Sequence, residues 1–226
     1  ISDISGLENY IYFPMSVDME RNVLIDSPFY TNQIEIIRTI AKSIPIGFKL
    51  IVKENPAQKL REWRPISDYK KIIEIPNVVM IHPSVRGQEI IKKSSLVISL
   101  AGSSPLEASF YKKPAIVFGN VVYSLLESVS KVTNLEKLPD LIKESLTTEV
   151  DSSDLNRFID LIEKNTVSFD ISKFETEFNS MFQYDGWLVN TEIDEVVLRN
   201  FLDEHENDFK DLIRGYKEKI FEHKNN

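Results

Sequence analysis

The densest group of residues able to do chemistry lies at residues 101–107, which read AGSSPLE. Ser103 and Ser104 supply two consecutive hydroxyl groups, and Gly102 keeps the preceding turn free of bulk. A turn of small residues that leads into a helix offers backbone N–H groups to an anion such as a phosphate. Glu107, one turn into the predicted helix, is placed to accept hydrogen bonds from a ribose. The stretch therefore predicts half of a nucleotide-binding site.

The same residues also fit a structural function, and this alternative stays open at the sequence level. Ser104 followed three residues later by Glu107 is a capping-box pattern that any helix can use at its start. Two features favour the binding interpretation. A second hydroxyl exceeds what a cap requires, and the turn follows the apolar run at 96–100, which is typical of a strand buried on both faces.

A second polar group, KENP at residues 53–56, follows another apolar run at 48–52. Its Lys53 can neutralise a phosphate, and its Asn-Pro turn can direct the Asn55 amide toward the same anion. The alternative is a solvated strand end closed by a turn. Arg64 is a further candidate binding residue, because its guanidinium can clamp an anion. His82 is another candidate binding residue, because it ends a third predicted strand.

Composition limits the classes of function. Residues 1–150 carry 18 Lys and Arg against 17 Asp and Glu, whereas residues 151–226 carry 9 against 18. An acidic second half argues against nucleic-acid binding, which requires a basic surface. With no cysteine and three scattered histidines, the sequence predicts neither a disulfide framework nor a metal site. No transmembrane segment is predicted, and dinucleotide, P-loop and nucleophile-elbow motifs are missing.

The apolar runs predict the elements that must position these residues. Short buried strands are expected at 9–13, 48–52, 78–81, 96–100, 115–118 and 129–133. Helical stripes between them predict an α/β fold, a Rossmann-like doubly wound parallel sheet of five to six strands. Its loops at the carboxyl edge would collect the candidate residues. Residues 15–28 are expected to be a loop and polar connector, and residues 121–128 are expected to be helical. We expect a nucleotide-sugar-binding domain at 1–148 and an α-helical C-terminal extension at 149–226. Helices of the extension are expected at 151–164, 172–182 and 190–221. The segment 190–221 is either one long helix or a broken pair of helices.

Four spaced segments resemble the capsular polysaccharide biosynthesis family. They are YFPM at 12–15 with Glu20 following, LIVKENP at 50–56, AGSSPLEA at 101–108 and KPAIVFG at 113–119. That family is similar to GT-B glycosyltransferases, which include the bacterial Kdo transferases and, more distantly, sialyltransferases. The resemblance covers residues 9–146 and corresponds to the C-terminal, donor-binding half of a GT-B enzyme.

The resemblance implies transfer of a sugar from a nucleotide-activated donor, often CMP-linked, in capsule or surface polysaccharide biosynthesis. It implies no cofactor besides this donor substrate, and a polysaccharide or glycolipid as the acceptor. Two positions depart from the family's pattern: Asn55 replaces a His, and Met19 replaces a Pro. The expected donor-binding residues are Lys53, Asn55, Pro56, Ser103, Ser104, Glu107, Gly102, Ser16, Glu20, Arg64 and His82.

Two alternatives remain at this level. One is a non-catalytic nucleotide-sugar-binding or scaffold module that pairs with a separate catalytic domain, and the other is a nucleotide-sugar epimerase. The chain starts with Ile rather than Met, and no acceptor domain is recognisable in it. We therefore expect a piece of a longer protein whose N-terminal domain, or a partner chain, supplies the acceptor side and the unidentified catalytic residues. A cytoplasmic location is expected, with peripheral association with the inner face of the plasma membrane as an option.

Overall fold

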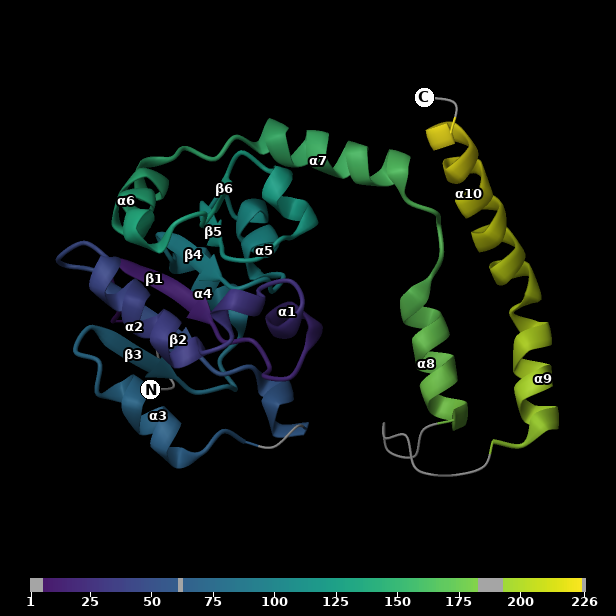
Figure 1. Ribbon diagram of the computed structural model, residues 1–226, viewed down its shortest axis with the longest axis horizontal. Coiled ribbons are helices and arrows are strands. Elements are labelled where there is room, and N and C mark those ends of the chain that lie inside the picture. The colour runs from purple at the N-terminus through teal and green to yellow at the C-terminus, as the bar shows by residue number, and fades with distance from the viewer. Residues whose placement is uncertain (1–5, 61–62, 183–192, 225–226) are drawn as a thin grey trace. The chain divides into compact units, whose positions relative to one another are not determined.

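The computed structural model of the chain describes residues 6–60, 63–182 and 193–224. It divides into two compact units, Ile1–Phe158 and Ile159–Asn226. We call them the sheet unit and the helical unit, and each is described by itself (Figure 1). The division falls inside helix α7 (Ser152–Asn165), ten residues after the boundary that the sequence predicts.

The sheet unit contains one sheet of six parallel strands in the order β3-β2-β1-β4-β5-β6. The strands are β1 (Tyr10–Pro14), β2 (Lys49–Lys53), β3 (Val78–Ile81), β4 (Leu96–Ser99), β5 (Ala115–Val117) and β6 (Val129–Lys131). The predicted fold class, a Rossmann-like doubly wound α/β sheet, is confirmed. Burial explains the apolar runs, because the central strands β1, β4 and β5 are covered on both faces.

Helices cover both faces of this sheet (Figure 1). On one face, the main core joins strand residues such as Phe13 and Val52 to α2 (Gln33–Ser43), α3 (Ile66–Ile73) and α6 (Leu138–Thr147). On the other face lie α4 (Gly87–Lys93) and α5 (Ser104–Phe110). Successive strand residues alternate between the two faces. Ile11 and Phe13 enter the main core, whereas the Tyr10 hydroxyl donates to the Ile90 carbonyl of α4 at 2.8 Å.

Two connections between elements differ from what the sequence predicts. Residues 15–28, expected to be an irregular connector, contain the short helix α1 (Arg21–Leu24), and the 3-10 turn η1 (Pro28–Tyr30) follows. Residues 121–128, expected to be helical, form the 3-10 turn η3 (Val122–Leu125). The remaining 3-10 turns are η2 (Pro56–Leu60) and η4 (Leu135–Lys137). Glu20, at the N-cap of α1, makes no side-chain cap hydrogen bond.

The helical unit contains the end of α7 together with α8 (Ile171–Phe182), α9 (Glu195–Glu204) and α10 (Glu206–Lys224). The stripe predicted at 190–221 is thus a broken pair, and its first residues, 190–192, lie outside the described residues. Phe174 packs its ring against those of Phe178, Phe201 and Phe209. Between α9 and α10, His205 is 6% exposed, and its ring nitrogens each lie 3.0 Å from a carboxylate, those of Glu177 and Asp208.

Candidate functional site

The strand order identifies where this sheet can bind a ligand. Strands run outward from β1 in one direction and from β4 in the other, so the connections diverge between them. At such a switch point the loops after the two strands leave a crevice at the carboxyl edge of the sheet. Here these loops are residues 15–20 after β1 and residues 100–103 after β4. Both were predicted to carry donor-binding residues.

Lys53 ends β2, directly beside this crevice, and its register partner in β1 is Pro14. Leu50 and Val52 enter the main core, so the alternation of the strand directs Lys53 to the face that α4 covers. The residue is only 7% exposed, yet its ammonium makes no hydrogen bond or ion pair with any residue that the structure describes. Burial lowers the pKa of Lys53 below its ordinary value of 10.5, and the charge of Glu54 offsets part of this effect.

Glu54 has other partners, because it points to the opposite side of β2. Its carboxylate accepts from Arg64 Nε at 2.8 Å, from the Tyr69 hydroxyl at 2.9 Å and from the Asn55 backbone N–H at 2.9 Å. Glu54 is fully buried and Arg64 is 8% exposed. Burial alone would lower the pKa of Arg64, but the carboxylates of Asp18 and Glu54 raise it above its ordinary value.

Arg64 also holds the loop after β1. One of its terminal nitrogens donates to the carboxylate of Asp18, and the other donates to the Ser16 carbonyl at 2.7 Å. Gln33, at the start of α2, accepts from the Ser16 N–H at 2.9 Å and donates to the Ser16 carbonyl at 2.9 Å. The predicted site residues Ser16 and Arg64 are therefore brought together, with Arg64 in contact with protein groups that position the loop.

Met19 follows in the same loop with φ at 64°, a left-handed conformation that is uncommon outside glycine. Its side chain is 80% exposed. The resemblance places a Pro at this position, but the pyrrolidine ring fixes φ near −65°. The backbone path before Glu20 is therefore one that the Pro of the family's pattern could not follow.

The turn after β4 is braced from two sides. The Gly102 N–H donates to Ser99 Oγ at 3.1 Å, and the Tyr123 hydroxyl donates to the Gly102 carbonyl. The capping box expected from Ser104 and Glu107 does not form, because α5 begins at Ser104 and its N-cap is Ser103. Instead, Ser103 Oγ donates to Glu107 Oε1 at 2.7 Å. Ser103 is exposed, and Ser104 and Glu107 are half-buried; all three follow β4 at the carboxyl edge of the sheet.

Asn55 and Pro56 form the turn that leaves β2. Asn55 Oδ1 accepts from the Ala57 backbone N–H at 3.0 Å, and the Asn55 carbonyl accepts from the Gln58 N–H at 3.0 Å. The amide oxygen thus closes the turn, while exposed Pro56 begins η2. The asparagine therefore has a structural function of its own in this conformation.

His82 lies apart from Lys53, at the mouth of a separate pocket. This pocket of about 410 Å³ is mostly apolar and is lined by Glu54, Trp63, Tyr69, Ile73, Met80, Ile81, His82 and Pro83. The exposed His82 accepts the Ser84 backbone N–H at its Nδ1, at 3.2 Å. Met80 belongs to the main-core side of the sheet. The pocket therefore opens on the α3 side of β3, whereas Lys53 points to the α4 side.

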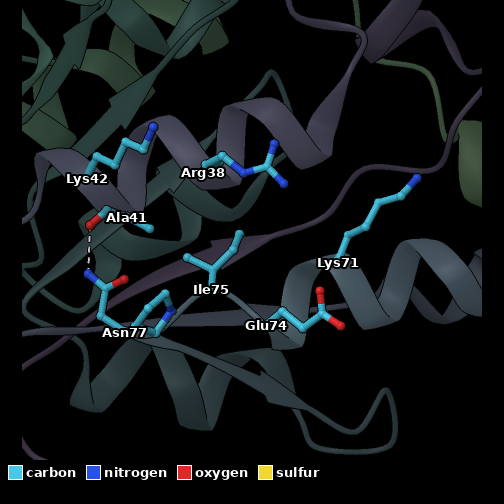
Figure 2. Close-up of a pocket in the computed structure, with 8 residues that line it drawn as sticks. Arg38, Ala41, Lys42, Lys71, Glu74, Ile75 and Asn77 are labelled. Atoms are coloured by element: carbon cyan, nitrogen blue, oxygen red, sulfur yellow. Dashed lines mark hydrogen bonds between the residues drawn. The ribbon is translucent and has the colours of Figure 1, made fainter.

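Another pocket, of about 420 Å³, lies at the amino edge of the sheet, away from every predicted site residue. Figure 2 shows Arg38 and Lys42 projecting from α2, Lys71 from α3, and Glu74 from the C-cap of α3. The Asn77 amide at its base donates to the Ala41 carbonyl at 2.6 Å. This pocket is remote from the switch point, so we assign the candidate site to the carboxyl edge.

Several residues that shape the site escaped the sequence analysis. Asp18 and Gln33 hold the loop after β1, Tyr69 holds the buried Glu54, and Tyr12 lies buried in β1. Burial, and then the charge of Glu107, raises the pKa of Tyr12 above its ordinary value. No signal in the sequence separates these residues from others of their types, because their function comes from tertiary contacts.

Two kinds of feature, a metal-binding cluster and a membrane-spanning helix, are absent from the described residues. No cluster of three or more His, Cys, Asp and Glu side chains suited to a metal ion occurs among them. Within the same residues, no helix combines the length and the apolar character that a membrane crossing requires.

No protein-family model matches the sequence, and no curated protein matches it. Solved structures with a similar fold include the beta Kdo 2,7 transferase KpsC of Thermosulfurimonas dismutans. Its sequence is 16% identical to this chain and the TM-score is 0.44, and the match covers 70% of this chain and 55% of the KpsC chain. The spinosyn rhamnosyltransferase SpnG, complexed with spinosyn aglycone, matches with 16% identity, a TM-score of 0.45 and coverage of 70% and 42%.

A UDP-GlcNAc 2-epimerase from Methanocaldococcus jannaschii matches with 17% identity, a TM-score of 0.48 and coverage of 70% of this chain and 46% of that one. The chain thus spans about half the length of these structures, between 42% and 55%. They comprise two sugar transferases and one nucleotide-sugar epimerase. Similarities of this extent carry no activity across to the chain.

Proposed function

We propose that the sheet unit binds the phosphate of a nucleotide-activated sugar at its carboxyl edge, as the donor-binding half of a glycosyltransferase. The resemblance of its sequence motifs to the capsular polysaccharide biosynthesis family supports a function in capsule or surface polysaccharide synthesis, with a CMP-linked sugar as the first donor to test. The acceptor in this proposal is a polysaccharide or a glycolipid.

The observation that carries the proposal is the unpaired ammonium of Lys53, whose side chain is nearly buried. A charge that is largely withdrawn from water is costly unless it is paired, and Glu54, the carboxylate nearest in sequence, is turned away and bonded to Arg64. Lys53 ends its strand beside the switch point, where α/β sheets bind ligands. An anion in the crevice would supply the missing partner, and a phosphate is the anion that nucleotide-sugars carry.

The other groups at the crevice suit the rest of such a ligand. Ser103 and Ser104 offer hydroxyls at its rim, and the half-buried Glu107 can accept hydrogen bonds from a ribose. In sugar transfer, negative charge develops on the phosphate that leaves with the nucleotide. A preorganised cation such as Lys53 would stabilise that charge, which is the contribution of this half of the enzyme to catalysis. The acceptor side and the catalytic base would come from a further domain or chain.

One observation favours a second candidate, a non-catalytic nucleotide-sugar-binding module. Where the family's pattern has a His, Asn55 uses its amide oxygen to close the turn at Ala57. An amide carries no positive charge, so it cannot assist a leaving phosphate as an imidazolium does. Such a module would bind the same ligand and leave transfer to its partner.

The test is a comparison of nucleotide binding between two lysine variants of β2. Lys53→Met removes the ammonium of the nearly buried lysine, and Lys49→Met removes the exposed lysine at the other end of the same strand. CMP, UDP, GDP and their sugars are screened by thermal shift and then titrated by calorimetry. A ligand at 100 times its Kd should stabilise the wild type by about 2.7 kcal/mol, and only Lys53→Met should lose this effect.

Two results would contradict the proposal. One is that no nucleotide or nucleotide-sugar stabilises the wild type, and the other is that Lys53→Met binds as tightly as Lys49→Met. Where binding is confirmed, an assay for release of the sugar from the bound donor separates the two candidates. Turnover indicates the transferase, and binding without turnover in the presence of the partner indicates the module.

A further inference from the structure

Two tyrosines of β1, Tyr10 and Tyr12, share one face of the sheet but differ in their hydrogen bonding. Both rings are buried, with exposures of 0% and 2%. The Tyr10 hydroxyl donates to the Ile90 carbonyl at 2.8 Å. The Tyr12 hydroxyl makes no hydrogen bond with any residue that the structure describes. Buried tyrosine hydroxyls usually find a partner, so Tyr12 is the exception of the pair.

The Tyr12 hydroxyl is accessible to solvent. Among the described residues, Ser145 Oγ is the one side-chain polar atom that is both shielded from solvent and without a partner. Tyr12 Oη and Lys53 Nζ lack partners too, so both retain access to solvent although their residues are nearly buried. The nearly buried Tyr12 ring thus carries an unpaired hydroxyl that a bound group can reach.

The surroundings of Tyr12 place this hydroxyl near the carboxyl edge of the sheet, where α4 begins. A Cβ placed on Gly87, the first residue of α4, would lie 3.7 Å from Tyr12 Oη. The charge of Glu107, from α5, also acts on the phenol. Tyr12 pairs with Ile51, two residues before Lys53 on the same face of β2. The hydroxyl therefore lies beside the first turn of α4, on the face of the sheet to which Lys53 points.

We propose that Tyr12 is a binding residue whose hydroxyl donates a hydrogen bond to a phosphate oxygen of the ligand that Lys53 neutralises. The assignment rests on the proposed function, because it takes the ligand to be a nucleotide. A neutral donor beside a cation completes the binding of an oxyanion, since charge and a directed hydrogen bond act on the same group. Because the phenol is buried beside Glu107, it keeps its proton and remains a donor at neutral pH.

The experiment compares Tyr12→Phe with Tyr10→Phe, since each removes one hydroxyl from the same strand and face. Calorimetry with the nucleotide found to bind the wild type should show a Kd about 10- to 100-fold weaker for Tyr12→Phe, the loss expected for a hydrogen bond to a charged group. Without ligand, Tyr12→Phe should melt at the wild-type temperature. Tyr10→Phe should bind normally but melt about 2–4 °C lower, because it loses the bond to Ile90.

A second ligand tests the assignment to phosphate. The nucleoside that corresponds to the bound nucleotide lacks the phosphate, so Tyr12→Phe should leave its Kd unchanged. An equal loss for nucleoside and nucleotide would place the contact on the sugar or base and overturn the assignment. A Tyr12→Phe protein that fails to fold, or that melts as low as Tyr10→Phe, would show that the hydroxyl has an internal partner and would also overturn it.

The failure of this inference is distinguishable from the failure of the proposed function. If the wild type binds nucleotide, Lys53→Met does not, and Tyr12→Phe binds within twofold of the wild type, the donor site stands and the function of Tyr12 is refuted. If the wild type binds neither nucleotides nor nucleotide-sugars, the proposed function fails, and the inference that rests on it falls with it.

Discussion

Arg64 and Glu54 form an ion pair inside the sheet unit, with Arg64 Nε 2.8 Å from Glu54 Oε2 and side-chain exposures of 6% and 1%. The pair determines the electrostatics of its neighbour. Glu54 follows Lys53 directly, and a carboxylate with no other partner could neutralise that ammonium. Because Arg64, Tyr69 and the Asn55 N–H already occupy both oxygens of Glu54, Lys53 stays without a close anion.

Arg64→Met should destabilise the sheet unit strongly. The variant leaves Glu54 buried without its cation, and breaking a buried ion pair from one side typically lowers the free energy of unfolding by about 3–5 kcal/mol. It also removes one hydrogen bond each from the Ser16 carbonyl and the Asp18 carboxylate, which keep their bonds from Gln33. Urea denaturation followed by circular dichroism gives the change in free energy.

Arg38→Met is the matched control for Arg64. Arg38 pairs with Glu35 on the exposed surface of α2, and surface pairs contribute at most about 1 kcal/mol. The double variant Glu54→Gln/Arg64→Met should recover part of the loss, since no buried charge remains unpaired. If Arg64→Met and Arg38→Met are equally mild, the ion pair is not a structural determinant of the fold.

Lys53→Met should show, through the pH dependence of stability, that the surroundings of Lys53 lower its pKa. In the wild type, burial lowers the pKa of Lys53 below 10.5, so the charged form destabilises the fold at neutral pH. As pH rises through the lowered pKa toward 10.5, the folded state releases the proton first, and the unfolded state then binds more protons. The stability of the wild type relative to Lys53→Met should therefore rise over this window.

The measurement is urea denaturation of both proteins at several pH values between 7 and 10. The difference between them isolates Lys53, because other alkaline effects are shared. Lys49→Met serves as the control, since this residue is exposed, and its difference from the wild type should not change with pH. A flat difference for Lys53→Met would mean that the fold does not lower the pKa of Lys53.

Gly119→Ala should destabilise the loop after β5. A Cβ at this position would lie 2.6 Å from the Asp26 carbonyl oxygen and 3.0 Å from the Ala101 Cβ, closer than atoms can approach. Backbone must shift to admit it, at a cost of about 1–3 kcal/mol in unfolding free energy. Thermal denaturation of Gly87→Ala provides the comparison, because a Cβ there meets only an ordinary contact at 3.7 Å. Equal stability of the two variants would be inconsistent with the close packing at Gly119.

Phe174→Ala should weaken the helical unit and leave the sheet unit intact. The half-buried Phe174 ring contacts five neighbouring rings, those of Phe169, Phe178, Phe201, His205 and Phe209. Its loss should cost about 2–3 kcal/mol, somewhat less than for a fully buried Phe. Hydrogen exchange should accelerate within residues 159–226 alone. Phe221→Ala, at a 63% exposed position, is the control and should leave the stability of both units unchanged. Faster hydrogen exchange throughout residues 1–158 after Phe174→Ala would contradict the division into two units.

The sequence predicts the sheet well because each strand is a short apolar run bounded by turn residues. Alternation with helical stripes is enough to infer a parallel, doubly wound order. The helix α1 escapes prediction because its four residues bury only Val23, which is too little for a periodic pattern. The turn at Val122–Leu125 was expected to be helical because its apolar residues mimic a stripe, although only Tyr123 is buried.

The site is less predictable than the sheet. Lys53 and Ser103 could be located from the ends of their strands, but the partners of Glu54 could not. Adjacent residues of a strand point to opposite faces, so Glu54 turns from Lys53 toward Arg64, which arrives from a loop ten residues later. Tyr10 and Tyr12 are likewise equivalent in sequence, and only the position of Ile90 in the fold distinguishes their hydroxyls.

The position of β1 in the centre of the sheet also has a consequence for synthesis on the ribosome. β1 is the first strand of the described chain, yet Ile11 pairs with Leu96, and Tyr12 with Val97. At about 5–20 residues added per second, β1 waits roughly 4–17 s for β4 to be translated. During this interval one edge of the apolar segment Tyr10–Pro14 has no partner and is open to pairing with other chains. We expect the yield of folded protein to depend on what shields this edge while the nascent chain grows.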